Sequence, residues 1–533
     1  MFCATETILR PEKSLASERE QLIVGIVALE VSMNLQQFIK NLPDENSLSS
    51  ASRPYVNHSV EFKRVFSAAQ RAQMLETVGC NVFFFPSEMI TGCDLLSDSG
   101  TSTMTNEQWA GLHLGDESYG SNRGYFLLMN QVRETFGEQF FNDPSLKRPN
   151  AFIFHQGRPC EDALFSVLGR NASGLIIPSN GHFDTTEANI HASGIRPLNL
   201  FSPELKSENS EFAFKGNMDL ERLKMLLRNS TSAIPVIFLT ITNNTGGGQP
   251  VSLENIRAVA ELSHSHGIPL FFDACRFAEN AWFIKNYEKD YKHKSIKEIV
   301  KEMFSHVDGF TVSFKKDGLV NMGGGLFLKD DGLFMKKYPA IPDALLNYQI
   351  IKEGHPTYGG LSGRDIMTLS VGLKTVTQEC YLKHRIEQVQ QFGKSLQKKG
   401  IPVLTPIGGH AVYLDVNKFF QDTQLKPEDF GGISLTALLL AGYGHRACEL
   451  GYFAFGSYDP LTKKEIHPEV NFVRFAIPRL RYEAQDLEAT AESVKVLHEQ
   501  RFKIPAVTVV HGRELSLRHF KARFQLREMN ELA

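Results

Sequence analysis

The sequence predicts an α/β protein built around a mainly parallel sheet. Short apolar runs alternate with amphipathic helical patterns from about residue 56 onward, and this alternation is typical of βαβ units. The chain has 533 residues, of which 42% are hydrophobic and 22% charged, so it is long enough for two or more domains. The formal net charge of −3 gives no reason to expect a nucleic-acid or membrane-surface partner.

Four apolar runs are the expected strands of the sheet. "FIFH" leads into "QGRPCED", "VIFLTIT" into "NNTGGGQP", "IPLFFDA" into "CRFAEN", and "FTVSF" into two lysines. The four runs occupy residues 152–155, 236–242, 268–274 and 310–314. In an open α/β sheet, ligands bind beyond the carboxyl ends of the strands, so we expect the polar segments that follow these runs to converge on a site.

Two helical patterns connect the later runs. Residues 252–267 carry apolar side chains on one helical face, and Gly267 is placed as a stop signal. Ser295 and Glu298 form a capping-box pattern that predicts the start of a second helix. The apolar residues on these two helices are Leu253, Ile256, Val259 and Ala260 in the first, and Ile296, Ile299, Val300, Met303 and Phe304 in the second.

The first 55 residues are predicted to form an N-terminal extension, because "SLSSAS" at 47–52 is typical of a linker. The apolar stretch "LIVGIVALEV" is broken by Glu30, is too short to span a bilayer, and lacks the features of a secretory signal. The seven cysteines are odd in number and form no CxxC pair, which indicates reduced thiols. We therefore expect a cytoplasmic protein.

The polar residues after the first run suit the phosphate of pyridoxal phosphate. Gln156, Gly157 and Arg158 precede an expected helix at 161–168, whose free N–H groups and dipole favour an anion. Ser313, at the end of the fourth run, offers a hydroxyl to the same phosphate.

The third and fourth runs supply the other two groups that this cofactor needs, a carboxylate at its ring nitrogen and a lysine for its aldehyde. Asp273 emerges from a buried run, where a cationic ring would keep it ionised. Lys315 and Lys316 follow the fourth run, and a strand sends neighbouring side chains to opposite faces, so one lysine is expected inside and the other elsewhere. The periodicity does not say which.

Six blocks of the sequence resemble one enzyme family. They are "DACRFAENAWFIKNYEKDY", "SFKKDGLVNMGGG", "HPTYGGLSGRD", "GGHAVYLD", "VRFAIPR" and "LRHFKARF", and they resemble the aromatic amino acid β-eliminating lyases, tryptophanase and tyrosine phenol-lyase. The resemblance runs from about residue 56 to the end. It implies the aspartate aminotransferase-like fold type I of pyridoxal phosphate enzymes, with a seven-stranded, mainly parallel sheet in a large cofactor domain (102–370) and a smaller α+β domain (56–101 with 371–533).

The resemblance also implies how the cofactor is held. Lys316, the second lysine of the pair, matches the Schiff-base lysine, and Lys315 matches its supporting neighbour. The other matching positions are Gln156, Gly157, Arg158 and Ser313 at the phosphate, Phe183 stacked on the ring, Asn244 and Arg276 near the phenolic oxygen, and Asp273 at the ring nitrogen.

The substrate and the assembly are implied in the same way. Tyr119 matches the candidate acid for the leaving ring, and Arg474 matches the arginine that clamps the substrate carboxylate, a task suited to its bidentate fork. Tyr358 is expected to come from the partner subunit, because the family shares its active sites across a dimer within a homotetramer. A monovalent cation, potassium, is implied by Glu117 and by the positions that give it backbone carbonyls, Gly100 and Asn321.

Two residues depart from the family pattern. Pro159 stands in the phosphate loop where the family usually has glycine, and it removes a backbone N–H. His355 stands where the family tends to have an apolar residue near the substrate ring.

Three positions favour tryptophan as the substrate: Asp184, Leu450 and His519. By resemblance, phenol-lyases have threonine, arginine and phenylalanine there, whereas a carboxylate at Asp184 can accept a hydrogen bond from an indole N–H. The predicted reaction is cleavage of L-tryptophan to indole, pyruvate and ammonium. Two alternatives stay open. The first is a lyase for tyrosine or another β-substituted amino acid. The second is a catalytically silent relative used as a binding or structural protein through its N-terminal extension, and the retained cofactor residues count against it.

Overall fold

The structure is a computed structural model that describes residues 53–57, 59–141, 148–170, 173–206, 211–230 and 233–527. The chain divides into two units, 1–58 and 59–533, and every element and site below belongs to the second. The predicted linker at 47–52, and all of the predicted extension except 53–55, lie outside the described residues.

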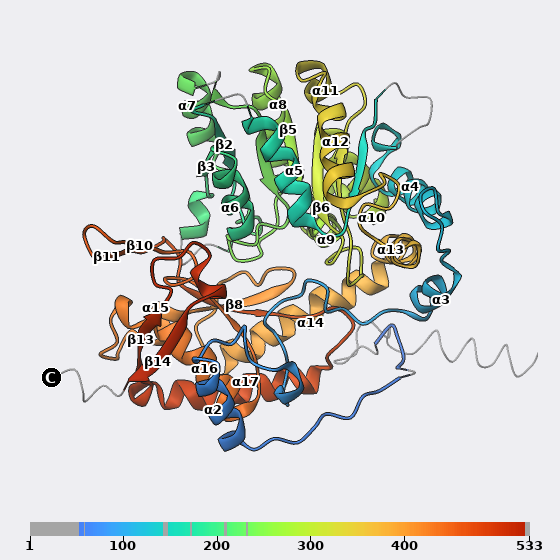
Figure 1. Ribbon diagram of the computed structural model, residues 1–533. Coiled ribbons are helices and arrows are strands. Elements are labelled where there is room, and N and C mark those ends of the chain that lie inside the picture. The colour runs from blue at the N-terminus through green and yellow to red at the C-terminus, as the bar shows by residue number, and fades with distance from the viewer. Residues whose placement is uncertain are drawn as a thin grey trace, which may run out of the picture. The chain divides into compact units, whose positions relative to one another are not determined.

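A seven-stranded sheet forms the centre of this unit (Figure 1). Its strands lie in the order β1-β7-β6-β5-β4-β2-β3, and only β7 runs antiparallel to its neighbours. The mainly parallel sheet predicted from the sequence is therefore confirmed. The strands are β1 (Ala151–Phe154), β2 (Ile176–Ser179), β3 (Arg196–Asn199), β4 (Ile237–Thr240), β5 (Leu270–Asp273), β6 (Gly309–Ser313) and β7 (Gly324–Leu328).

Both faces of the sheet are covered, because successive side chains of each strand enter different cores. Phe152 and Phe154 pack with α5 (Gly157–Gly169), α11 (Leu333–Lys337) and α12 (Ile341–Glu353), whereas Ile153 packs in the opposite core. Buried strands of this kind read as continuous apolar runs, which is why the sequence revealed them. The helices of the opposite core are α4 (Arg123–Phe136), α7 (Leu220–Ser230), α8 (Leu253–Ser265), α9 (Phe277–Tyr287), α10 (Ile296–Ser305) and α13 (Gly363–Thr375).

The two helices predicted between the strands are confirmed as α8 and α10. The side chain of Ser252 accepts a hydrogen bond from the backbone of α8, and Ser295 with Glu298 forms the predicted capping box of α10. All nine predicted apolar positions of the two helices are buried. The helix expected at 161–168 begins earlier, at Gly157, so Gly157 and Arg158 belong to its first turn instead of a preceding loop.

A second group of elements packs around a three-stranded antiparallel sheet of order β8-β12-β9, formed by β8 (Ala411–Asp415), β12 (Phe472–Ala476) and β9 (Cys448–Leu450). Its core contains side chains of α14 (Glu379–Lys398), α16 (Gly431–Tyr443) and α17 (Ala484–Glu499). Helix α2 (Ala68–Thr77) packs on α16. The predicted division into domains at residues 101 and 370 stays a prediction, since 59–533 forms one unit.

The remaining elements are short. They are α3 (Asn106–Leu114), α6 (Asp184–Ala192), α15 (Val416–Phe419) and the hairpin pairs β10 (Ser457–Asp459) with β11 (Lys464–Ile466) and β13 (Ala506–His511) with β14 (Arg523–Arg527). Among the described residues, no helix is long and apolar enough to cross a membrane.

Candidate active site

A cavity of about 290 Å³ lies at the carboxyl ends of the parallel strands. Residues after β1, β4, β5 and β6 line it, together with the start of α6 and residues of β9, β12 and the segment 96–99. Fourteen of the residues singled out from the sequence meet there: Gln156, Gly157, Arg158, Phe183, Asp184, Asn244, Asp273, Arg276, Ser313, Lys315, Lys316, Leu450, Arg474 and His519.

One end of the cavity is a compact anion cradle. A Cβ at position 157 would lie 2.7 Å from the Cβ of Ser313, so only glycine lets the first turn of α5 approach the end of β6 this closely. The unpaired N–H groups of that turn and the hydroxyl of Ser313 can donate to a phosphate. Pro159 is the third residue of α5, where a missing N–H breaks no helical bond, but it does remove one donor from the cradle.

Two carboxyl groups line the wall next to this cradle. Asp273 ends β5, and the buried Glu161 projects from α5. Burial, and after it the charge of Asp273, raises the pKa of Glu161 to about 8, so Glu161 is mainly protonated at neutral pH. Thr186 (2.7 Å) and Asn189 (3.3 Å) of α6 donate hydrogen bonds to Glu161, which ties α5 to the helix that begins after Phe183.

The adjacent thiol is not poised for chemistry. Cys275 follows Asp273 by two residues, and its sulfur accepts a hydrogen bond from the backbone N–H of Ser313 (3.3 Å). Burial, and after it the charge of Asp273, raises the pKa of Cys275 to about 12. Cys275 is therefore a packing group and not a nucleophile.

Both lysines of the pair line the cavity, although strand alternation led us to expect one lysine inside and the other elsewhere. The physical reason is that β6 ends at Ser313, and Lys315 and Lys316 lie in the turn that follows, where strand alternation no longer applies. Burial, and after it the charge of Lys316, lowers the pKa of Lys315. The backbone carbonyl of Lys315 accepts a hydrogen bond from Gly100 N–H at 2.7 Å.

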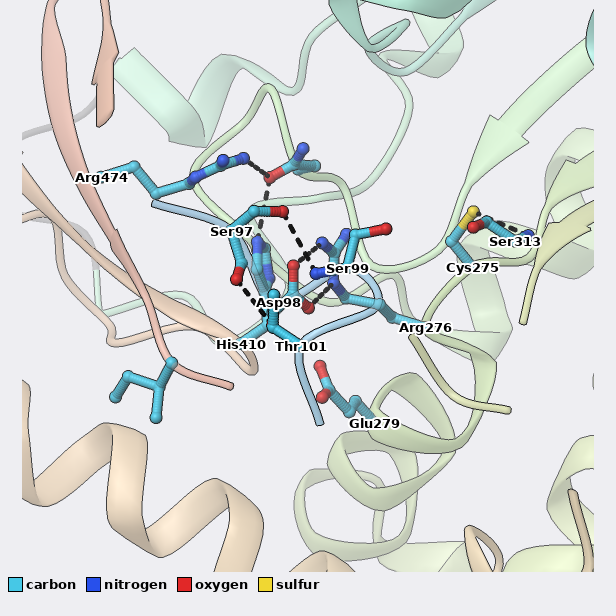
Figure 2. A network of polar contacts seen from close by, with 12 residues as sticks. Ser97, Asp98, Ser99, Thr101, Cys275, Arg276, Glu279, Ser313, His410 and Arg474 are labelled. Atoms are coloured by element: carbon cyan, nitrogen blue, oxygen red, sulfur yellow. Dashed lines mark hydrogen bonds and ion pairs between the residues drawn. The ribbon is translucent and has the colours of Figure 1, made fainter. Parts of the chain in front are cut away.

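A polar network occupies the side of the cavity next to Arg276 (Figure 2). The guanidinium of Arg276 binds Asp98 through two hydrogen bonds, Nε to Oδ2 at 3.0 Å and Nη2 to Oδ1 at 2.7 Å. Arg276 and His410 are the charges that hold the pKa of Asp98 well below its usual range despite its burial. A fixed ion pair of this kind keeps the Arg276 side chain in one orientation toward the cavity.

Arg474 and Asn244 lie in the same network. Asn244 Oδ1 accepts from Tyr413 Oη at 2.6 Å, lies 2.9 Å from His410 Nε2, and accepts a longer bond of 3.5 Å from Arg474 Nη1. Arg474 Nη2 donates to the Leu96 carbonyl at 2.9 Å, and its buried Nε has no hydrogen-bond partner among the described residues. Arg474 also lines the cavity, so its guanidinium lies beside any anionic ligand bound there.

Sequence reasoning missed Asp98, His410, Tyr413 and the fully buried Arg479. Arg479 donates to Asp98 (2.9 Å), Glu279 (2.8 Å) and Asp317 (2.9 Å), and Asp317 directly follows Lys316. Apart from the contact of Tyr413 with His410, the bonds that bring these residues to the site join positions more than 150 apart in the sequence, so no local spacing could have revealed them.

Part of the cavity wall pairs a carboxylate with an imidazole. His519 Nε2 lies 3.0 Å from Asp184 Oδ2, and both side chains are buried. The rings of Phe83 and Phe520 pack against His519, Leu450 also lines the cavity, and no lysine or arginine forms a hydrogen bond or ion pair with Asp184 among the described residues.

Five predicted site residues lie outside the cavity lining: Tyr119, Tyr358, Glu117, Gly100 and Asn321. Tyr119 is 80% exposed, and its ring contacts that of Tyr358 with centroids 5.6 Å apart. Glu117 forms an ion pair with Arg364 at 2.5 Å, with both side chains exposed.

The two carbonyl positions do lie together. A Cβ at Gly100 would meet the backbone oxygen of Asn321 at 2.9 Å, which places the two backbones side by side. No cluster of three or more metal-ligating side chains occurs among the described residues.

Comparison with known proteins agrees with this arrangement. The family pattern described as beta-eliminating lyase matches residues 94–493. A tryptophanase of Salinibacter ruber is 39% identical over 470 residues, covering 88% of this chain and 94% of that protein. A tyrosine phenol-lyase of Fusobacterium nucleatum is 37% identical over 476 residues, covering 89% and 98%. A probable beta-eliminating lyase of Trichomonas vaginalis is 38% identical over 456 residues, covering 86% and 94%. The chain belongs to the beta-eliminating lyase family.

Proposed function

We propose that this lyase cleaves L-tryptophan to indole, pyruvate and ammonium with the help of pyridoxal phosphate and a potassium ion. The observation that carries the choice of substrate is the Asp184–His519 pair in the cavity wall, which Leu450 also lines. An indole N–H is a donor only, and a carboxylate held by histidine is an acceptor for it. A phenol oxygen beside Asp184 would face another acceptor, and no lysine or arginine forms an ion pair with Asp184 among the described residues.

The residues present fit the cofactor. The cradle at Gly157 and Ser313 has the donors and the close approach that a phosphate requires, Asp273 supplies a carboxylate, and the cavity contains a lysine amine. The residues proposed to hold the group are Gln156, Gly157, Arg158 and Ser313 at the phosphate, Phe183 on the ring face, Asp273 at the ring nitrogen, Asn244 and Arg276 at the phenolic oxygen, and Lys316 at the aldehyde. When bound, this cofactor acts as an electron sink for a carbanion at the substrate Cα.

The chain's own residues divide the remaining work. Arg474, which lines the cavity, binds the substrate carboxylate and so orients the amino acid. Lys316, which lines the cavity, removes the Cα proton, and Lys315 lies beside it as its supporting neighbour. Asp184 accepts the indole N–H and fixes the ring. An acid must then protonate the ring carbon, and Tyr119 is the proposed donor.

Tyr119 is proposed to act in the cavity of a partner subunit. Its exposure and its contact with Tyr358 place the two tyrosines on one surface cluster outside their own cavity. The sequence led us to expect only Tyr358 from the partner, but because the rings touch, both would arrive together. The proposed assembly is a homotetramer in which each dimer shares its two sites.

Potassium is proposed to bind at the adjacent carbonyls of Gly100 and Asn321. Glu117 lies two residues before Tyr119, so it too would reach this site from the partner subunit. An oxygen cage selects ions by size, whereas screening by salt does not. We expect higher activity in potassium than in sodium at equal ionic strength, and equal activity in the two salts would remove the ion from the proposal.

The deciding experiment compares pyruvate release from tryptophan, tyrosine, serine and S-methylcysteine under the same conditions. We expect kcat/KM for tyrosine to be lower than for tryptophan by about tenfold or more, or about 1.4 kcal/mol of transition-state discrimination. Faster release from tyrosine would make the chain a phenol-lyase. Release from none of the four, by protein that has bound the cofactor, would favour a silent relative.

A further inference from the structure

His519 lines a second, smaller cavity in addition to the active-site cavity. This small cavity has a volume of about 10 Å³, which is room for one water molecule. Its polar lining comes from His519, Asn81, Thr436 and Glu449. Asn81 is already occupied, because its amide donates to the carbonyls of His519 (3.0 Å) and Ala522 (2.9 Å).

The imidazole of His519 has one satisfied nitrogen and one that lacks a partner. Nε2 lies 3.0 Å from Asp184, while the buried Nδ1 has no hydrogen-bond partner among the described residues. Phe520 and Phe83 pack against the ring, with centroids 4.1 Å and 5.8 Å away, so it cannot turn without disturbing both. A buried polar nitrogen left without a partner is costly, and such groups are normally paired with protein or with ordered water.

Glu449 is a buried carboxylate that accepts no hydrogen bond from another side chain among the described residues. It lies in the middle of β9, between Cys448 and Leu450, whose side chains face the active-site cavity, so strand alternation turns Glu449 to the opposite face. It accepts hydrogen bonds from the backbone N–H groups of Phe453 (3.1 Å) and Ala454 (2.9 Å).

The charges around Glu449 come from two directions. Burial raises the pKa of Glu449, and the nearby charges of His519 and Arg518 oppose that shift. Arg518 already forms an ion pair with Glu465 at 2.9 Å, so its charge is matched elsewhere. His519 is left between two carboxylates, Asp184 on Nε2 and Glu449 across the small cavity.

We propose that Glu449 is a positioning residue for ring recognition, acting on His519 through one water molecule in the small cavity. His519 Nδ1–H donates to this water, and the water donates to Glu449 and to Thr436 Oγ1, whose own hydrogen is directed at the Ile433 carbonyl (2.9 Å). This arrangement fixes the His519 ring and leaves Asp184 as an acceptor for the substrate ring N–H. This inference rests on the proposed cleavage of tryptophan.

The test compares a substrate that needs the ring contact with one that does not. Glu449→Gln removes the carboxylate, and Thr436→Val removes the hydroxyl with almost no change of shape. Thr135→Val is the matched control, because Thr135 on α4 is equally buried, its hydroxyl has no partner among the described residues, and it lines neither cavity. Pyruvate release is measured from tryptophan and from S-methylcysteine, and the affinities of indole and of indene, which lacks the N–H, are measured by calorimetry.

We expect Glu449→Gln to lower kcat/KM for tryptophan and the affinity for indole by about tenfold, the value of one hydrogen bond. Thr436→Val should act in the same direction but less. S-methylcysteine and indene should change by less than about twofold in every variant, as should all four readouts in Thr135→Val.

Equal losses for the ring and ringless compounds in Glu449→Gln would show a merely structural role and overturn the inference. Unchanged tryptophan kinetics in that variant would overturn it as well. Failure of the proposed function is a different result, in which the unmutated protein releases pyruvate from S-methylcysteine but not from tryptophan.

Discussion

Adjacent residues can share a cavity when the strand before them has ended, and Lys315 and Lys316 do so. Their different proposed roles therefore depend on which amine can reach the cofactor aldehyde, and not on the two lysines lying on opposite faces of a strand. Lys315 is held by its backbone carbonyl, which accepts from Gly100, and its Cε would lie 2.7 Å from a Cβ at that glycine. Lys315 thus packs toward Gly100, which leaves Lys316 for the cofactor.

The corresponding prediction concerns the covalent link to the cofactor. Lys316→Ala should abolish the link and the yellow colour, because only this amine reaches the aldehyde, whereas Lys315→Ala should keep both and turn over more slowly. Borohydride reduction followed by mass spectrometry of the labelled peptide measures the link directly. A label on Lys315 in the Lys316→Ala protein would reverse the two assignments.

At the scale of residues, the sequence predicted those site members that follow a recognisable apolar run. Asp273 and Ser313 end β5 and β6, so their place at the rim follows from the strands alone. Asp98 and His410 could not be found in this way, because each acts through a partner that only the fold brings near: Arg276 is 178 positions from Asp98, and Asn244 is 166 from His410.

At the scale of elements, α5 is the case in which the sequence misled. Glycine and proline are poor residues for a helix interior, so Gly157 and Pro159 made the segment read as a loop. In the first turn neither residue breaks a helical hydrogen bond, and the helix starts four residues before the expected position. The buried strands were predictable to within a few residues, because a strand that is buried on both faces has apolar residues at successive positions.

The position of Pro159 leads to a prediction about cofactor affinity. Pro159→Ala restores an N–H in the first turn of α5, and one added hydrogen bond to the phosphate should tighten cofactor binding by about fivefold, or about 1 kcal/mol. Pro342→Ala is the matched control, since Pro342 also lies in the first turn of a helix, α12, but lines no part of the cavity. Equilibrium dialysis of the cofactor gives both dissociation constants. An unchanged constant for Pro159→Ala would show that this N–H does not face the phosphate.

At the scale of the whole molecule, two features connect distant parts of the chain. The buried guanidinium of Arg479, just after β12, meets carboxylates from the segment before α3, from α9 and from the turn after β6. The second feature is the contact between Tyr358 and the exposed Tyr119, which lies outside the cavity of its own subunit. The first feature holds one subunit together, and the second makes that subunit incomplete if the two tyrosines serve a neighbour.

Mixing two inactive variants tests this division of labour. Lys316→Ala and Tyr119→Phe should each be nearly inactive, but co-expressed they should recover roughly a quarter of the normal activity, because half of randomly paired dimers are mixed and each mixed dimer has one intact site. Pyruvate release from tryptophan, with the subunit ratio checked by mass spectrometry, is the measurement. Recovery no greater than the sum of the two variants would place Tyr119 in its own subunit's site.

Folding raises the pKa of the buried Glu161, and this shift makes the stability of the fold depend on pH. Its pKa rises from 4.5 to about 8 on folding, so the folded state binds more protons than the unfolded chain between these values. Stability must therefore fall as the pH rises from 4.5 toward 8, and then level off. The cofactor-free protein should melt at a lower temperature at about pH 8.5 than at about pH 6. This difference in melting temperature should be smaller in Glu161→Gln, because glutamine has no proton to lose. If the melting temperature falls equally in both proteins, groups other than Glu161 cause the loss of stability at alkaline pH. If the fall is smaller in Glu161→Gln, ionisation of an active-site carboxyl group is what destabilises the fold at alkaline pH.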